Sequence, residues 1–356
     1  MEFLTLHKLL YSLALAMPLV AQDPSPDPPA GERWNLYFQA TSIGQYHPAF
    51  TSPYSGPFSL AGHREAEASI TSTIFFGFRI ARDTQFYFNP ELAGGRGFSN
   101  TDGLANFSNG EMPRVATAAP KPYIARLYIT QDFALGDERE AVESDENQLS
   151  GSRPAKRYSI TLGRFTVTDF FQVNPYSNDP RTQFMGWATM YNAAWDYPAD
   201  TRGYTWGWVH ELHMPHWSLR YASAAMPLVA NGLRFDRRLF RDRADMFEGE
   251  LRGRIHHRDG SVKLLSYFNR AHMGNYGEAI RLAQQTGARP DVTATRQTGT
   301  LKYGFGLSAD QEIVKDVAVF GRLGWNDGKT ESFAFTAVDR LASVGRVCQR
   351  DALEAP

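Results

Sequence analysis

Apolar and polar residues alternate along much of this chain. Phe86, Phe88 and Leu92, for example, are separated by polar residues that include Gln85 and Glu91. A side-chain period of two places the two sets on opposite faces of a β-strand. The pattern recurs in roughly a dozen segments. The predicted strands are residues 33–41, 70–80, 84–92, 125–133, 158–163, 188–197, 204–213, 217–223, 247–257, 262–269, 301–308, 317–325 and, more weakly, 332–336.

The connections between these strands carry their own expectations. Asp259-Gly260 and Asp327-Gly328 have the composition of hairpin turns. The acidic stretch 137–146 is expected to be a solvated turn, and residues 276–285 form the one segment with a helical pattern.

Two architectures expose such strands differently. A soluble sandwich hides the apolar face in a core, whereas an outer-membrane barrel turns it to lipid and lines a channel with the polar face. Many of the predicted strands run to about 9–11 residues, as in membrane barrels, whereas soluble strands average about 5–6. We therefore predict an all-β fold, a transmembrane antiparallel β-barrel.

Composition agrees with that choice. The 356 residues are 42% hydrophobic and 13% aromatic, and the mean hydropathy of −0.40 is too polar for a helical membrane protein. The formal net charge of −1 gives no indication of nucleic-acid binding. Cys348 is the only cysteine, which excludes a disulfide within the chain.

The ends of the chain differ from the alternating region. Lys8 followed by the apolar stretch 9–20 has the pattern of a Sec signal peptide, expected over residues 1–21. Residues 22–32 are Pro-rich and expected to be flexible. The barrel domain is predicted over residues 33–343. Residues 344–356 show no alternation and are expected to form an off-pattern tail.

Six segments have a more specific pattern than alternation alone. They are HPAFTSPYSGPFSL (47–60), FYFNPELAGGRGFSNTDGLANF (86–107), LGRFTVTDFFQVNPYSNDPRTQF (162–184), WDYPADTRGYTWG (195–207), NRAHMGNY (269–276) and GWNDGKTESFAFTAVDR (324–340). In this order they resemble the carbohydrate-selective porins of the OprB family. The resemblance implies a sixteen-stranded transmembrane antiparallel β-barrel of the porin type in the outer membrane of a Gram-negative bacterium, through which sugars and small polar solutes diffuse passively. It also implies outer-membrane lipid, lipopolysaccharide and the barrel-assembly machinery as partners, either a homotrimer or a monomer, no enzymatic activity and no cofactor.

The chain departs from the family pattern near its end. Family members continue through further strands after the segment that ends at Arg340, whereas here the alternation stops near Val344. This difference predicts a C-terminally truncated or frame-shifted product, with an incomplete barrel.

The polar faces of the strands supply candidate lining residues, which would either contact sugars or simply solvate the lumen and pair with one another. These residues are Arg79, Asn89, Glu91, Arg126, Asp132, Arg252, Arg254, Lys302 and Arg322. The loop 166–184 combines polar and aromatic residues and is the candidate constriction, or else an ordinary surface loop. Its polar candidates are Asp169, Asn174, Tyr176, Asn178, Asp179 and Arg181. Trp195, Asp196 and Tyr197 could form a sugar platform, and the two aromatic residues could equally belong to an interfacial girdle.

The sequence evidence for a catalytic or metal site is weaker than the evidence for a pore. His210 and His213 point to opposite faces of a predicted strand, which disfavours a zinc site. Glu248 and Glu250 share a face, as a pair of glycosidase carboxylates would, but Arg252 continues the same row. The alternative function is an exported soluble β-rich protein that binds or cleaves glycans.

Overall fold

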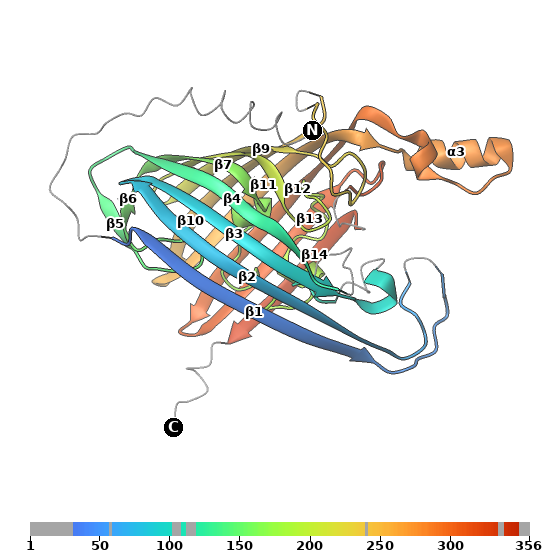
Figure 1. Cartoon of the computed structure of the whole chain (residues 1–356), viewed down its shortest axis with the longest axis horizontal. Coiled ribbons are helices and arrows are strands. Elements are labelled where there is room, and N and C mark those ends of the chain that lie inside the picture. Colours follow the sequence, from blue (N-terminus) through green and yellow to red (C-terminus); the bar gives the residue numbers. More distant parts are fainter. Residues whose placement is uncertain are drawn as a thin grey trace.

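The computed structural model describes residues 31–56, 59–101, 108–111, 119–238, 241–333 and 338–348. Twelve strands form one curved sheet in which each strand pairs antiparallel with the next (Figure 1). They are β1 (Trp34–His47), β2 (Glu65–Ala81), β3 (Thr84–Gly95), β4 (Lys121–Ala134), β7 (Arg157–Phe165), β8 (Thr205–His213), β9 (Trp217–Ala225), β10 (Arg243–Ile255), β11 (Arg258–Met273), β12 (Gln297–Val314), β13 (Val317–Asn326) and β14 (Arg340–Cys348).

Smaller elements complete the described chain. β5 (Arg139–Val142) and β6 (Gly151–Pro154) form a separate two-stranded hairpin. The helices are η1 (Phe98–Thr101), η2 (Val167–Asp169), α2 (Trp187–Met190), α3 (Tyr276–Thr286) and η3 (Val292–Thr295). None of the helices in the described ranges is long and apolar enough to cross a membrane.

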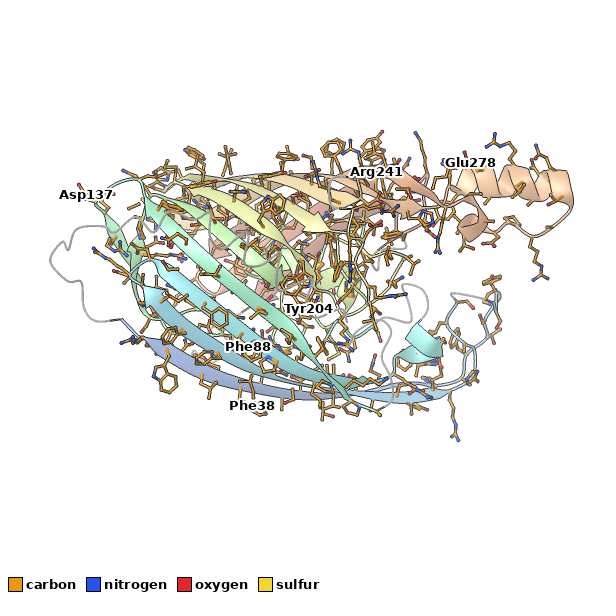
Figure 2. All side chains as sticks on the ribbon, turned by 45° about the horizontal axis from the view of Figure 1, so that its top comes forward. Phe38, Phe88, Asp137, Tyr204, Arg241 and Glu278 are labelled. Atoms are coloured by element: carbon orange, nitrogen blue, oxygen red, sulfur yellow. The ribbon has the colours of Figure 1, made fainter. Side chains whose placement is uncertain are left out.

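The strand register aligns the apolar positions into continuous rows. Leu36 lies opposite Phe76, Phe76 opposite Phe88, and Phe88 opposite Leu127. These rows cover the outside of the sheet, where Phe38 lies in Figure 2 with 68% of its surface exposed. An exposed apolar belt is unfavourable in water and is the normal outer surface of a membrane barrel. The predicted alternation is confirmed, with the apolar face outward.

Connections at the two ends of the sheet differ in length. At one end, which we call the short-turn end, Arg82–Asp83, His256–His257 and Lys315–Asp316 join strands directly. At the other, the long-loop end, residues 166–204 and 274–296 form long connections, and α3 projects from this end (Figure 1). Short turns on one side and long loops on the other are typical of outer-membrane barrels.

Within the described part of the chain, β1 and β14 each pair on one side only, so the barrel is not closed. β14 also corrects a prediction: the strand continues to Cys348, which pairs with Val317, across the expected boundary at residue 344. Alternation is weak there because half of the side chains are exposed and the others only partly buried. Backbone pairing with β13 therefore defines this strand.

Three other sequence expectations were wrong or only partly testable. Residues 188–197 form the end of α2 and a buried irregular segment instead of a strand, because this segment packs on both sides inside the sheet. The turn predicted at Asp259-Gly260 lies at His256–His257, and Asp259 belongs to β11. Ser332 and Phe333 are not in a strand, and residues 334–336 lie outside the described residues. The predicted signal peptide (1–21), residues 22–30 and the part of the predicted tail from residue 349 also lie outside them. The helix predicted over 276–285 is confirmed as α3.

Candidate functional site

The connection between β7 and β8, residues 166–204, folds into the concave side of the sheet and is called here the inner segment. Figure 2 shows Tyr204, at its end, within the curve of the strands. Its apolar residues form a core with inward side chains of the wall; the largest are Phe171, Trp187, Trp195 and Tyr197. Gly306 on β12 makes room for this packing, since a Cβ there would lie 2.7 Å from Nδ2 of Asn192. The sequence therefore specifies a filled interior at this level of the sheet.

Buried polar contacts fasten the inner segment to the far wall. Arg322 on β13 is 1% exposed and donates hydrogen bonds to Ser177 Oγ at 3.1 Å and to the carbonyl of Thr189 at 2.9 Å. Lys302 on β12 places its ammonium 3.3 Å from Oδ2 of Asp196, with side chains 1% and 0% exposed. Buried charges persist only when paired and hydrogen-bonded, so these contacts fix the segment inside the sheet.

A large polar cavity lies between the inner segment and the short-turn end of the sheet. Its volume is about 1460 Å³. Among the described residues, six Arg or Lys side chains and seven Asp or Glu side chains line it, together with hydroxyl and aromatic groups. The predicted lining residues Asp132, Arg252 and Arg254 are among them. The cavity is thus strongly polar but nearly balanced in charge.

Much of that balance comes from an ionic network across β8 to β12. Arg220 contacts carboxylate oxygens of Glu211 at 2.9 Å, Glu248 at 3.1 Å and Glu250 at 2.8 Å. Lys263 lies 3.6 Å from Glu250. Glu248 and Glu250 are therefore satisfied by cations of the wall and have the arrangement of a charge ladder, not of a catalytic pair.

A smaller cavity of about 280 Å³ lies on the long-loop side of the same segment. Glu91 borders it and accepts hydrogen bonds from the hydroxyls of Thr73, at 2.7 Å, and Tyr123. The guanidinium of Arg202 lies 4.2 Å from the centroid of the Tyr123 ring. Aromatic faces, cations and carboxylates thus converge in a confined polar space.

The two cavities share four lining residues, which define what we call the junction: Glu146, Asn147, Asp169 and Asn178. Asp169 is held by Arg126 in a bidentate pair, with both N–O distances 2.7 Å. The junction is therefore polar on every side for which the structure gives residues.

Sequence comparison places this architecture in a family. A family model described as carbohydrate-selective porin, OprB family, matches residues 77–345. The chain belongs to the OprB family. No curated protein matches the sequence of this porin.

A comparison with solved structures also found similar proteins. The high-pH structure of Pseudomonas putida OprB has a TM-score of 0.58 at 14% identity, covering 88% of this chain and 70% of that one. The low-pH structure of the same protein gives 0.44 at 12% identity, covering 89% and 73%. OmpT from Vibrio cholerae, in a trimer form, gives 0.35 at 7% identity, covering 88% and 84%.

Some predicted lining residues of this OprB-family porin make contacts that hold parts of the chain together instead of lining the lumen. Lys302 and Arg322 point inward but are buried as anchors of the inner segment. Asn89 is fully buried and donates to Asn147 Oδ1 at 2.8 Å. Arg79 donates to the carbonyls of Glu32, Arg82 and Ser150 at 2.9–3.0 Å. The alternating pattern predicted that these side chains point inward, but it could not predict which other parts of the chain pack over them.

The predicted constriction residues divide similarly. Asp169, Asn178, Asp179 and Arg181 border the smaller cavity, and Tyr176 borders the larger one. Asn174 is buried, and its amide donates to Ser308 Oγ at 3.3 Å. Residues 166–184 therefore lie inside the sheet and not on the outer surface of the protein.

The predicted sugar platform is wrong for two of its three members. Trp195 is 1% exposed and packs against Phe171 and Tyr197, so its ring offers no open face. Asp196 is buried with Lys302. Tyr197 is 4% exposed, although it borders the smaller cavity. Burial inside the sheet also removes Trp195 and Tyr197 from any interfacial girdle.

Arg181 lies in a local excess of acidic groups. Its guanidinium is 3.1 Å from Asp179, 3.7 Å from Glu146 and 3.8 Å from Glu111. Partial burial raises the pKa of Asp179, but hydrogen bonds from the Thr182 hydroxyl and the Arg181 backbone outweigh it and hold the pKa below its usual range. Burial raises the pKa of Glu111 and of Glu146 above the ordinary value.

Sequence reasoning missed several residues of the site. Arg220, Lys263 and Glu211 occupy inward positions of strands that were predicted, so alternation could have indicated them. Glu146 belongs to the acidic stretch expected to be a solvated turn, but it lies at the junction inside the sheet. Among the residues with described positions, no group of three or more His, Cys, Asp or Glu side chains is arranged to hold a metal ion.

Proposed function

We propose that this chain forms the wall of a water-filled outer-membrane pore through which neutral sugars and other small polar solutes diffuse passively. The carrying observation is the cavity of about 1460 Å³, lined by nearly equal numbers of opposite charges inside a sheet whose outer face is apolar. Membership of the carbohydrate-selective OprB family supports the same function. The fold and family are those of a channel rather than an enzyme.

Charge pairing in the wall favours neutral solutes over ions. The carboxylates of Glu248 and Glu250 already contact Arg220, so an ion that displaces such a contact leaves a buried charge unpaired. A sugar can exchange hydrogen bonds with these groups one hydroxyl at a time, because guanidinium is a multiple donor and carboxylate a multiple acceptor. Tyr176, on the larger cavity, presents an aromatic surface on the same route.

The two cavities define the route. A solute from the long-loop end would enter the smaller cavity between Glu91, Arg126 and Tyr204, pass the junction at Asp169 and Asn178, and reach the larger cavity. We place the selectivity filter at that junction because its residues border the smaller of the two cavities. Arg252 and Arg254 would line the exit.

The soluble glycan-binding alternative is disfavoured by the outer surface. Leu251, Leu264 and Phe305 lie on the outside of three neighbouring strands and are 68%, 58% and 47% exposed. Such a belt requires lipid or detergent to cover it.

Liposome swelling tests the proposal. The full chain is refolded into vesicles, and the rate of swelling is measured in isotonic monosaccharide, disaccharide and trisaccharide. Swelling that falls steeply with sugar size is expected. Vesicles that contain inserted protein but do not swell in any sugar would overturn the proposal, and the chain in detergent-free buffer controls for a soluble fold.

A further inference from the structure

One connection at the short-turn end is far longer than its neighbours. Residues 135–156, between β4 and β7, contain the β5–β6 hairpin, whereas β10–β11 and β12–β13 are joined by two residues. Figure 1 shows β5 and β6 at the end of the sheet away from α3. This hairpin therefore approaches the lumen from the side opposite to most of the long loops.

The end of the hairpin is a tight turn. Asp145 and Gln148 exchange two backbone hydrogen bonds of 3.0 Å, which leaves Glu146 and Asn147 as the two turn residues. Asn147 has φ of 58°, a left-handed conformation that asparagine tolerates well. Glu146 and Asn147 together are called the hairpin tip.

Contacts with the barrel wall hold the tip in place. Asn35 on β1 donates to the carbonyl of Gln148 at 2.8 Å. Glu32 accepts from the Ser144 hydroxyl at 2.6 Å and from the Ser150 N–H at 2.9 Å. The neighbouring Leu149 is 2% exposed. The tip is thus held inside the sheet by hydrogen bonds and apolar packing on both of its sides.

A glycine in the wall makes this approach possible. A Cβ at Gly77 on β2 would lie 2.6 Å from Oδ1 of Asn35 and 3.3 Å from Cδ2 of Leu149. The first atom belongs to a side chain that holds the hairpin and the second to the hairpin itself, so a larger residue would press on both. The fold is therefore adapted to receive this segment.

The tip meets the inner segment at the junction of the two cavities. Glu146 and Asn147 border both cavities, and Glu146 Oε2 lies 3.7 Å from the guanidinium of Arg181. That separation exceeds a direct hydrogen bond, and the Glu146 side chain is 35% exposed. Its oxygens can therefore accept hydrogen bonds from a passing solute while remaining near the positive charge of Arg181.

We infer that Glu146 is a specificity-determining residue of the pore, contributed from the short-turn end to a filter otherwise built by the inner segment. Its carboxylate would accept hydroxyl protons of a neutral sugar and repel anions. This inference rests on the pore proposed above and adds that the proposed filter is built from both ends of the barrel.

Bilayer recordings of Glu146→Gln and Glu146→Lys test the inference, with Glu143→Gln and Glu143→Lys as matched controls. Glu143 belongs to the same hairpin, is exposed and borders neither cavity. One unit charge acting over about 4 Å of water changes the local concentration of a monovalent ion about fivefold. Because the charge raises the local cation concentration and lowers the local anion concentration by the same factor, the anion-to-cation permeability ratio, from reversal potentials, should rise about 25-fold in Glu146→Gln and further in Glu146→Lys. Equal shifts at positions 143 and 146, or none at 146, would overturn the inference.

A second measurement separates this inference from the pore itself. In a Cys348→Ser background, Glu146→Cys and Asn178→Cys are treated with a short bis-maleimide, and Glu138→Cys with Asn178→Cys is the control. Glu138 lies at the base of the hairpin. Selective cross-linking of the 146–178 pair supports the tip at the filter even if the wild-type chain does not conduct, an outcome that would refute only the pore. Absence of that cross-link would refute the position of the tip.

Discussion

The buried pair between Lys302 and Asp196 should dominate the anchoring of the inner segment. Lys302→Met leaves the buried Asp196 carboxylate without this cation, although the backbone N–H of Phe333 still donates to it. Asp196→Asn leaves the ammonium of Lys302 without its countercharge. Breaking one side of a fully buried pair costs about 3–5 kcal/mol. Each single variant should lose that amount of unfolding free energy.

The double variant Lys302→Met/Asp196→Asn removes both charges and should lose less unfolding free energy than the sum of the two single losses. Contacting residues show coupling energies of about 0.5–3 kcal/mol in double-mutant cycles. Urea unfolding of the refolded protein in detergent, followed by tryptophan fluorescence, measures all four free energies. Trp195 adjoins the pair in sequence and is buried in the same core, so it reports on this region.

An exposed pair provides the control. Arg254 and Asp259 lie 2.7 Å apart at a turn, but their side chains are 71% and 77% exposed. Exposed pairs contribute about 0–1 kcal/mol, so Arg254→Met should change stability little. If Lys302→Met were as mild as Arg254→Met, or if the cycle were strictly additive, the anchoring role of the buried pair would be refuted.

Three further outcomes are expected. Leu251→Arg on the outer face should cost about 2–4 kcal/mol in a bilayer, whereas Leu233→Arg in a long loop should cost little; equal insertion of both into vesicles would contradict a lipid-facing belt. Arg322→Met removes the Arg322 donor from the buried carbonyl of Ser177, at a cost of about 1–3 kcal/mol; the carbonyl of Thr189 loses one of two donors and keeps the Ser177 hydroxyl. The variant should raise single-channel conductance as the inner segment loosens, and unchanged conductance would refute that anchor. Burial raises the pKa of Glu146, so acidification should remove its charge above the ordinary carboxyl range and lower cation preference there; the same pH profile in Glu146→Gln would contradict this assignment.

The strands were predictable because two solvents act on them. Lipid outside and water inside impose opposite polarity on successive residues, and Phe86 and Phe88 against Gln85 and Glu91 express that demand directly. The inner segment has protein on both sides, so its sequence loses the alternation and was misassigned around residues 188–197. β14 was cut short for a related reason, because its inward side chains are only partly covered.

The alternating pattern could not predict which polar side chains of the site contact each other. Arg126 and Asp169 were both candidates, yet their bidentate contact depends on how far a connection of 39 residues folds back. Lys302 and Asp196 were likewise separate candidates whose mutual burial removes both from the lumen. A residue's face follows from local sequence, whereas its partner follows from the path of the loops.

The hairpin tip is the clearest example of a position that depends on the path of a loop and not on the local sequence. An acidic run such as 137–146 usually indicates solvent exposure, and its hydration would be lost by entering a core. Asp137, Glu138, Glu143 and Asp145 of this run are exposed, but its last residue, Glu146, borders both polar cavities, where Arg181 compensates its charge. Asn35 and Glu32 hold the neighbouring residues of the hairpin. In a pore the inside is itself a solvent, so polarity alone cannot tell an outer turn from one that faces the lumen. The tip is distinguished by its position, because it borders the same two cavities as Asp169 and Asn178 of the inner segment.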